Sequence, residues 1–347
     1  MRIARLDPSD DIGAARWDAF VNACPAASFF HRAAWQGVIG EVFRHPTYFL
    51  YAHDDGEGGE IRGVLPLAHV NSRLFGNALI ALPFAVYGGI AADNEAAATA
   101  LEEEAERLAR RLGVDHLEFR NVAPRHADWP TQDLYVTFRK AILPDVEANM
   151  LAIPRKQRAM VRKGIKHGLV SHIDDQADRF FALFADNVHR HGTPALPKAY
   201  FATLLRVFGP DCEILTVTAP DGRPLSSVLS FYFRDEVLPY YAGDDEAARD
   251  FAANDFKYWE LLRRACERGL RVFDYGRSKV GTGPYAFKKN WGFLPQPLHY
   301  EYRLYKRDSI PQNNPANAKY RFFIAAWRRL PLSLANRLGP LIVRNLG

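Results

Sequence analysis

The chain has 347 residues, enough for two domains, and its 48% hydrophobic and 13% aromatic residues exclude a wholly disordered protein. Its three cysteines, Cys24, Cys212 and Cys266, are too few and too widely spaced for a disulfide framework or a zinc ribbon, and they favour a reducing compartment. The formal charge of +5 is concentrated in the tail, because the residues from Arg303 onward hold nine Lys/Arg and one acid, so it excludes a general DNA-binding protein.

Neither a secretory signal nor a membrane-spanning helix is predicted. Residues 1–11 contain no apolar run after their basic residues, and a signal peptide requires one. The longest apolar stretches, 78–86 and 322–327, are far shorter than the ~20 residues that cross a bilayer. We therefore expect a cytoplasmic protein.

The first half of the chain predicts a mixture of helices and strands. Alternating residues flank an acidic, glycine-rich turn at 54–60, which is typical of a strand hairpin. The segment 94–112 is rich in Ala, Glu, Arg and Leu and ends at Gly113, as helices often do. In chain order we expect helices at 14–24 and 29–42, a hairpin at 48–53 and 62–70, a short apolar segment at 78–82, a helix at 94–112 and a strand at 115–120.

The second half repeats this order. In chain order we expect a strand at 135–143, a basic helical segment at 145–167, a strand at 170–173, helices from Asp175 and at 198–208, a hairpin at 213–219 and 225–234, a strand at 237–242, a helix at 252–268 and a strand pair ending near Tyr305. Residues 50–120 thus parallel residues 215–276. This parallel predicts a duplicated α/β unit, with a ligand cleft between the two halves.

One stretch, residues 273–293, combines features of a ligand site. It reads F-D-Y-G-R-S-K-V-G-T-G-P-Y-A-F-K-K-N-W-G-F and predicts a strand, a loop with three glycines, and a short helix. The loop carries Arg277 and Lys279, and glycines expose N–H groups that can face an anion. Cations, N–H groups and aromatic rings together favour a ligand that bears a phosphate or an acyl group. The alternative is a structural turn with solvated lysines.

The order of elements in the second half resembles the GNAT acyltransferases. Residues 285–293 read Y-A-F-K-K-N-W-G-F, which is similar to the F-Y-x-x-x-G-F ending of that family. Two such domains in tandem, with a basic helix opening the second, resemble the Fem-type peptidoglycan bridge aminoacyltransferases and the BioF2-like acetyltransferase domains. With G-T-P-A-L-P-K at 192–198 and L-P-L-S-L-A-N-R-L-G-P at 330–340, the chain resembles the Fem-like proteins of exosortase/PEP-CTERM exopolysaccharide systems.

The resemblance implies an α/β (α+β) fold of tandem GNAT-like acyltransferase domains, each a mixed, mostly antiparallel sheet flanked by helices. We expect domains at 1–134 and 135–306, with the main site in the second, and a tail at 307–347. The implied reaction is N-acyl transfer to an amino group of a cell-envelope or exopolysaccharide precursor. Two alternatives stay open: an acyl-CoA-dependent N-acetyltransferase on an amino sugar, and a non-catalytic binding partner in exopolysaccharide assembly.

The acyl donor is expected to be a co-substrate, aminoacyl-tRNA or acyl-CoA, with no bound cofactor. GNAT enzymes that use acyl-CoA usually carry Q/R-x-x-G-x-G/A at the start of the donor helix, where N–H groups bind pyrophosphate. The matching window, 249–254, reads R-D-F-A-A-N. Arg249 fits this pattern, but Ala252 replaces the glycine and Asn254 replaces the small residue. We expect the methyl group at 252 to crowd a phosphate, which favours aminoacyl-tRNA or another carrier.

Lys288 matches the lysine that Fem-type enzymes carry in an F-K-x-x-W/F-G context near the reacting centre. We expect it to act in catalysis with Tyr285, by holding a phosphate or the oxyanion. Asp244, at the end of the third strand, is a candidate base for the incoming amine. For each of these residues the alternative is a solvated charge or an ordinary turn.

The other candidate residues would bind substrate. A basic helix opens the second half and has few acids to balance it, which favours contact with a pyrophosphate or a tRNA backbone. His189 and His191 form an H-x-H pair with no third ligand nearby, so we predict no metal site. The candidate substrate-binding residues are Arg155, Arg158, Arg162, Tyr241, Arg249, Arg277, Lys279, Lys289 and Tyr87.

The tail is basic and amphipathic. Phe323, Trp327 and Leu330 share one helical face, and Pro331 and Pro340 interrupt the segment. Two interpretations stand side by side: peripheral contact with the inner face of an anionic membrane, or docking on the protein's own surface. A lipid-linked acceptor would fit the first.

Overall fold

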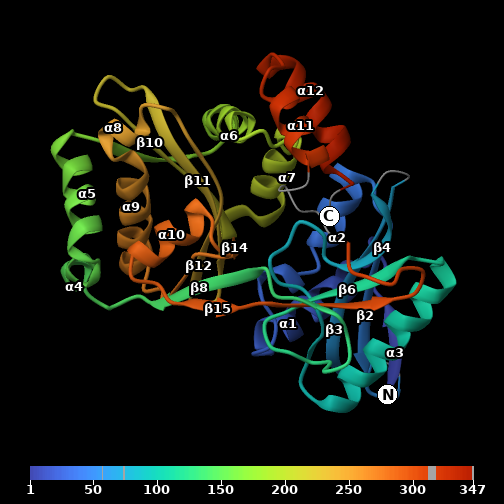
Figure 1. Cartoon of the computed structure of the whole chain (residues 1–347). Helices are drawn as coiled ribbons and strands as arrows, with labels where there is room; N and C mark the ends of the chain where they lie inside the picture. The colour runs from blue at the N-terminus through green and yellow to red at the C-terminus, as the bar shows by residue number, and fades with distance from the viewer. Residues whose placement is uncertain (57, 73–74, 312–317, 346–347) are drawn as a thin grey trace. The chain divides into compact units, whose positions relative to one another are not determined.

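The computed structural model describes residues 1–56, 58–72, 75–311 and 318–345 (Figure 1). The chain forms two compact units: Met1–Tyr135 with Pro297–Gln312 and Arg344–Gly347, and Val136–Gln296 with Asn313–Val343. Each unit contains one sheet with mostly antiparallel pairing and flanking helices. The predicted α/β fold class is therefore confirmed.

The sheet of the first unit has the strand order β1-β2-β3-β4-β6-β16-β7, with β5 beside β3. Pairing along it is antiparallel except between β4 and β6, which run parallel. The strands are β1 (Arg2–Arg5), β2 (Thr47–His53), β3 (Ile61–Ser72), β4 (Gly76–Ala81), β5 (Ala91–Ala92), β6 (His116–Asn121), β7 (Thr131–Gln132) and β16 (His299–Leu304).

The sheet of the second unit has the strand order β9-β10-β11-β12-β13-β8-β14, with β15 beside β8. Its parallel pair is β12 and β13, and its first four strands pair antiparallel. The strands are β8 (Tyr135–Ala141), β9 (Val170–Asp174), β10 (Cys212–Thr218), β11 (Pro224–Phe233), β12 (Glu236–Asp244), β13 (Val272–Asp274), β14 (Ser278–Lys279) and β15 (Pro295–Pro297).

The two sheets have the same topology, which supports the predicted duplication. In each sheet, four antiparallel strands are followed by a strand that pairs parallel to the fourth, and then by a strand taken from elsewhere in the chain. That sixth strand is β16 in the first unit and β8 in the second. Our expected second domain, 135–306, included 299–304, whereas these residues pair with β6 of the first unit.

The helices of the first unit cover both faces of its sheet. Alternation along β2 directs Phe49 toward Trp17 of α1 and Leu50 into the core that holds Leu101 of α3. The expected helix at 29–42 is broken, because Arg32 is extended (ψ 138°). The helical segments are α1 (Asp11–Ala23), a 3₁₀ turn (Phe29–His31), α2 (Trp35–Val38), a π turn (Ile39–Phe43) and α3 (Glu95–Leu112).

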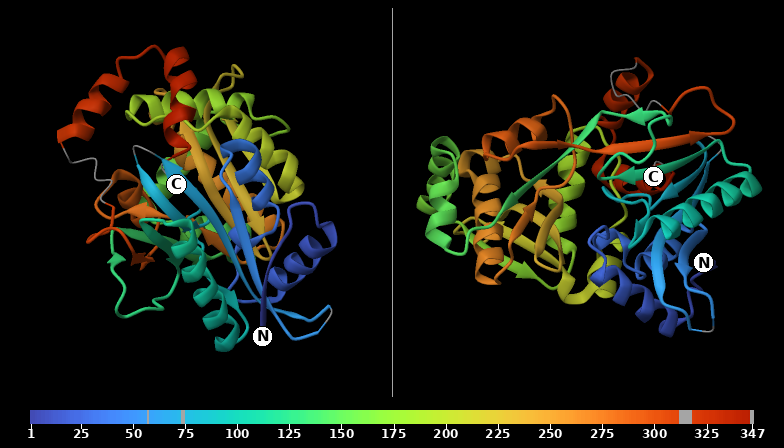
Figure 2. Two further views of the ribbon diagram at one scale, coloured as in Figure 1. Left: turned by 90° about the vertical axis from the view of Figure 1, so that its right-hand side faces the viewer. Right: turned by 90° about the horizontal axis from the view of Figure 1, so that it is seen from below.

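In the second unit, α9 packs on one face of the sheet and is covered by α5, while α6 and α7 lie on the other face (Figures 1 and 2). A Cβ at Gly164 of α5 would lie 2.8 Å from that of Phe256, so glycine permits this close packing. The helices are α4 (Val146–Ala152), α5 (Arg155–Lys166), α6 (Asp178–Arg190), α7 (Lys198–Phe208), α8 (Ala248–Phe251), α9 (Ala253–Glu267), α10 (Gly283–Asn290), α11 (Ala318–Trp327) and α12 (Leu332–Val343).

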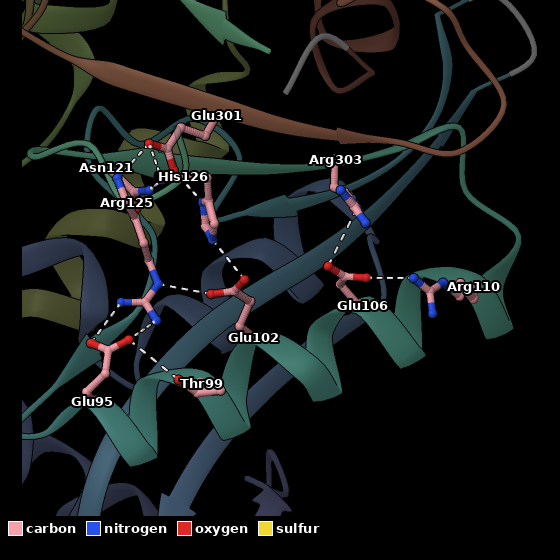
Figure 3. A network of polar contacts seen from close by, with 10 residues as sticks. All are labelled: Glu95, Thr99, Glu102, Glu106, Arg110, Asn121, Arg125, His126, Glu301 and Arg303. Atoms are coloured by element: carbon pink, nitrogen blue, oxygen red, sulfur yellow. Dashed lines mark hydrogen bonds and ion pairs between the residues drawn. The ribbon is translucent and has the colours of Figure 1, made fainter. Parts of the chain in front are cut away.

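A buried glutamate secures the late strand β16 in the first unit (Figure 3). Glu301 is fully buried and accepts hydrogen bonds from Asn121 Nδ2 (2.8 Å), Arg125 N (2.7 Å) and His126 Nδ1 (2.7 Å). The Nε2 atom of His126 lies 2.8 Å from Glu102 of α3. This network links β16 to the loop after β6 and to α3, so it holds in place a strand that is distant in the sequence.

The tail docks within the second unit. Trp327 of α11 is buried, and its carbonyl lies 3.1 Å from His189 Nε2 of α6. A Cβ at Gly339 of α12 would lie 3.0 Å from the carbonyl oxygen of Ala195. Side chains of 318–322, including Lys319 and Arg321, lie outside the described residues. Among the described residues, no helix has both the length and the apolar character needed to cross a membrane.

Candidate functional site

The candidate site lies where the sheet of the second unit opens. Parallel pairing between β12 and β13 consists of Glu236↔Val272 and Val237↔Phe273, and β12 then continues to Asp244. Helix α9 follows β12 and forms the crossover to β13. In an α/β sheet, ligands commonly bind at the carboxyl ends of diverging strands beside a helix N-terminus. This end of β12, with α9 and the loop after β13, is the candidate site.

The equivalent opening in the first unit is filled by the unit's own chain. Gly88 forms a bridge with Arg120, beyond the end of the β4–β6 ladder at Ile80. The buried Arg120 guanidinium donates to the carbonyl of Ala85 (2.6 Å) and to Glu118 (2.7 Å). Tyr87, a candidate ligand contact, is buried here against the ring of Phe30. Of these two equivalent openings, the one in the second unit is therefore the candidate ligand site.

The helix that borders the site begins with a residue in a left-handed conformation. Ala252 has φ +57° and ψ 32° and immediately precedes α9. Glycine adopts this conformation readily, whereas a residue with a Cβ is strained in it. Ala252 thus keeps the backbone that a glycine would give. Its side chain is buried, so our expectation that the methyl crowds an incoming phosphate is not supported.

We expect glycine substitution to separate strain from packing at this position. Ala252→Gly loses a buried methyl but relieves the left-handed strain. Ala253→Gly, one residue into the helix, also loses a methyl, relieves no strain, and increases the backbone entropy of the unfolded chain. The first variant should therefore be more stable than the second by about 1–2 kcal/mol. Urea unfolding of both variants measures the difference. Equal stabilities would contradict strain at Ala252.

A buried lysine holds the end of β12. Lys257 of α9 is 0% exposed, and its Nζ lies 2.9 Å from Asp244 Oδ1. The same carboxylate oxygen accepts a hydrogen bond from the Ser226 hydroxyl of β11, and Arg190 donates to the Asp244 carbonyl. Asp244 therefore links three elements through one ammonium, one hydroxyl and one guanidinium. The sequence pattern indicated Asp244 but gave no indication of Lys257 or Ser226.

A second carboxyl joins α9 to the central stretch. The indole N–H of Trp291 donates to Asp255 Oδ1 at 2.9 Å, and both side chains are buried. Burial raises the pKa of Asp255 to about 6, while Trp291 and Lys257 oppose the shift. The folded carboxyl thus keeps its proton at pH values at which an ordinary one (3.8) has lost it. The stability that this proton contributes is present below pH 3.8 and is lost as the pH rises toward 6.

This shift predicts a pH-dependent difference between wild type and Asp255→Asn. The asparagine cannot ionise, so its advantage over wild type should grow by up to about 3 kcal/mol between about pH 4 and pH 7. Urea unfolding at a series of pH values measures it. Asp250→Asn, an exposed carboxyl on α8, is the matched control and should give a flat difference. Parallel curves for wild type and Asp255→Asn would refute the buried proton.

Lys288 faces the main chain of the loop that follows β13. Its Nζ donates to the carbonyls of Tyr275 (2.6 Å), Gly276 (3.0 Å) and Arg277 (3.1 Å), and the residue is 9% exposed. An ammonium has three protons, so these carbonyls account for all of them. Burial lowers the pKa of Lys288 to about 7, and Asp274 opposes the shift. In this arrangement the Lys288 ammonium holds the loop rather than an external anion.

The aromatic residues of the central stretch belong to the core. Tyr285 packs edge-on against Phe138 (5.5 Å between centroids), and Phe293 packs against Phe273 and Tyr275. Tyr285 stays half-buried. The order of aromatic residues in 285–293 thus reflects the packing of α10 on the sheet. These aromatic side chains form a wall beside the candidate site.

Tyr241 lies on the face of β12 that is turned away from α9. A bulge at Tyr240, which has no partner in β11, places both tyrosine rings on the side of α6 and α7. The hydroxyl of Tyr241 lies 3.2 Å from that of Tyr200, and its ring contacts Phe184. Two residues further along, a Cβ at Gly243 would lie 2.4 Å from the Phe184 amide nitrogen, so β12 requires glycine there.

The basic side chains of α5 form a charged surface. Gln157, Val161 and Gly164 face α9, and the opposite face carries Arg155, Arg162 and Lys166. Among the described residues, no carboxylate pairs with this face. Arg158 differs, because it is half-buried and donates to the Leu151 carbonyl at 3.0 Å. The structure therefore places Arg155, Arg162 and Lys166 on one face of α5, apart from Arg158.

The remaining candidates are scattered. Arg249 is exposed on α8, and Arg277 is exposed in the loop that Lys288 holds. Lys279 is half-buried on β14, and the ammonium of exposed Lys289 lies 5.6 Å from the Tyr285 ring centroid. Among the described residues, no group of three or more His, Cys, Asp or Glu side chains has the arrangement of a metal site.

This fold is shared by known proteins. Residues 155–289 match a family model described as "Acetyltransferase (GNAT) domain". No curated protein matches the chain in sequence. The chain is similar to a structure titled "Crystal structure of FemX", with a TM-score of 0.69 and 15% identity over 88% of this chain and 98% of that one.

Two further solved structures share the fold. One is that of L-PGS from Bacillus licheniformis (TM-score 0.57, 13% identity, 90% of this chain and 96% of that one). The other is a tandem GNAT protein from the clavulanic acid biosynthesis pathway (0.55, 14%, 89% and 99%). The predicted tandem GNAT-like fold is therefore confirmed. The resemblance to the PEP-CTERM-associated subgroup stays a prediction.

Proposed function

We propose that this chain is an N-acyltransferase that transfers an aminoacyl or acyl group to an amino group of a cell-envelope or exopolysaccharide precursor. The observation that carries the proposal is the opening between β12 and β13, bordered by α9 and by Asp244. The GNAT match over residues 155–289 spans these elements. The resemblance to Fem-type aminoacyltransferases supports the aminoacyl form of the reaction.

The chemistry needs little beyond positioning. The amine lone pair attacks the carbonyl carbon of an ester or thioester, a C–N bond forms, and the C–O or C–S bond breaks as the carrier leaves. The amine must also lose a proton. The Asp244 carboxylate, whose side chain is 31% exposed, is the group we propose to attract the ammonium and accept that proton. The Lys257 ammonium and the Ser226 hydroxyl hold this carboxylate in place.

Lys288 has a different role in this proposal from the one we expected. Because its protons point at three main-chain carbonyls, it would position the loop 275–277 rather than contact the oxyanion. Tyr285 would act as part of the wall, through its packing on Phe138. N–H groups in the first turn of α9, which lack partners within the helix, are the donors we propose for the carrier's phosphate or the oxyanion.

The charged face of α5 supports a large anionic carrier. Arg155, Arg162 and Lys166 lie in one row on a helix that packs directly on α9. A row of unneutralised cations binds a phosphate backbone in a salt-dependent way. Aminoacyl-tRNA is therefore the donor class that we propose.

The test is a binding comparison of aminoacyl-tRNA with acetyl-CoA, by calorimetry at two salt concentrations. The variant Arg155→Gln/Arg162→Gln/Lys166→Gln should weaken tRNA binding and flatten its salt dependence. Arg107→Gln/Arg111→Gln on α3 is the control, because both arginines are exposed but lie near Glu104. Binding that is unchanged in the α5 variant would count against the tRNA donor.

A second candidate, an acyl-CoA-dependent N-acetyltransferase, is favoured by one observation. Ala252 keeps the left-handed backbone of a glycine, and its methyl is buried, so pyrophosphate can approach α9. Tight binding of acetyl-CoA without binding of tRNA would select this candidate. If neither donor binds, the chain fits the third interpretation, a non-catalytic partner in glycan assembly.

A further inference from the structure

Helix α12 has one face committed to the protein. Ala335, Gly339 and Val343 recur at every fourth position and are buried. A Cβ at Gly339 would lie 3.0 Å from the Ala195 carbonyl oxygen, so the helix approaches the segment before α7 closely. This docking fixes the rotation of α12 about its own axis and therefore determines which residues face outward.

The outward face is apolar. Leu334, Leu338 and Leu341 are 41%, 38% and 60% exposed and follow one another at spacings of a helical turn. Arg337 lies beside them on the same helix and is exposed. The tail is basic: Arg328 and Arg329 are exposed as well, and the chain after Asp308 contains six Lys/Arg and no Asp or Glu.

We propose that this face of α12 binds the surface of an anionic membrane. The three leucines would enter the boundary between headgroups and acyl chains, while Arg337 and the exposed Arg328 and Arg329 would contact lipid phosphates. A second copy of the chain is a poorer occupant, because in a symmetric contact of this face the arginine of one α12 would lie close to that of the other. Anionic lipid matches both the apolar row and its positive surroundings.

In the structure, the exposed apolar face of the tail lies on α12 and not on the face that carries Trp327. Trp327, for which membrane contact and docking were both open, is buried, and its carbonyl lies within hydrogen-bond distance of His189. Helix α11 therefore takes part in docking through Trp327, and α12 presents the exposed leucines. The docking interpretation thus applies to the face that carries Trp327, and lipid binding is what we propose for the exposed face of α12. This proposal does not depend on the proposed acyl transfer.

The test is co-sedimentation of the full chain with vesicles of phosphatidylcholine alone and of phosphatidylcholine mixed with phosphatidylglycerol. The wild type should bind the mixed vesicles, and the variant Leu334→Gln/Leu338→Gln/Leu341→Gln should bind at least about tenfold more weakly. Arg337→Gln should weaken binding at low salt. The control is Leu151→Gln on α4, a leucine that is 63% exposed in the same unit, and it should bind as wild type does.

Two results would overturn the proposal. One is absence of wild-type binding to the mixed vesicles, and the other is binding that the triple variant leaves unchanged. Size-exclusion chromatography tests the second-copy alternative: a wild-type dimer that the triple variant dissolves, without vesicle binding, assigns the face to self-association. All three leucines are exposed, so the variants should fold, and thermal unfolding monitored by circular dichroism verifies this.

Discussion

Replacement of Lys257 by methionine is expected to lower the free energy of unfolding by about 2–3 kcal/mol. The methionine fills much of the same volume, but Asp244 loses the ammonium 2.9 Å away and keeps only its other donors. Breaking a fully buried ion pair costs more, about 3–5 kcal/mol. The smaller figure applies here because the Asp244 side chain is 31% exposed and water can replace part of the interaction.

A double-mutant cycle separates the ion pair from packing. In an Asp244→Asn background, Lys257→Met should cost at least about 1 kcal/mol less than in wild type, because the charge it would strand is absent. Urea unfolding of the four proteins gives this coupling energy. An equal cost in both backgrounds would mean that Lys257 acts through its packing, for example over the Tyr258 ring, 4.8 Å from the ammonium.

The same variant tests the proposed chemistry. Without the Lys257 ammonium, the Asp244 carboxylate loses one of the donors that fix its orientation. Under the proposed function, kcat/KM should therefore fall in Lys257→Met, and Asp244→Asn should lower it further because it removes the proton acceptor itself. A kcat/KM that both variants leave unchanged would remove Asp244 from proton transfer and leave it with a structural role.

Local patterns predicted most of the fold. The hairpin at 48–53 and 62–70, the helix at 94–112 and the parallel order of 50–120 and 215–276 are all present, because alternation, helix formers and turn residues are local signals. The exchange of β8 and β16 was not predictable in this way. A strand pattern at 299–304 shows that the segment is extended, but its partner β6 is far away in the sequence.

The candidate site was predicted only in part. Asp244 was found because it ends a strand, whereas Lys257 was missed because a lysine on a helix usually lies in solvent. A signal was present: Ala253, Lys257, Leu261 and Ala265 are spaced by four residues, and all four are buried. A lysine in an apolar row of this kind requires a partner, and the nearest strand end supplies one.

For Lys288, the sequence does not reveal which groups the side chain contacts. The motif around it predicted a lysine of importance, but only coordinates show that its protons meet three carbonyls of a loop eleven to thirteen residues earlier. Those carbonyls converge because Gly276, in the left-handed region at φ +62°, turns the chain there. Lys288 and the loop 275–277 are therefore structurally coupled.

Replacing Lys288 by methionine should therefore disrupt the loop. It leaves the carbonyls of Tyr275, Gly276 and Arg277 without their shared donor, and we expect a loss of about 2–4 kcal/mol in unfolding free energy. Because burial lowers the pKa of this amine from 10.5 to about 7, the wild type gains stability as the pH rises from 6 toward 10, so the loss in Lys288→Met should be smallest near pH 6 and should grow with pH. Lys289→Met, at the exposed neighbouring position, is the matched control and should change stability by less than about 0.5 kcal/mol.

The pair of variants also separates a positioning role from a catalytic one. If Lys288 positions the loop, Lys288→Met should increase hydrogen exchange at residues 275–279, and Lys288→Arg should restore part of the stability by offering donors to the same carbonyls. If the ammonium instead contacts the reacting group, Lys288→Met would abolish turnover with exchange in the loop unchanged. The carbonyl distances of 2.6–3.1 Å favour the first outcome, because a lysine with all its protons engaged has none to give to a substrate.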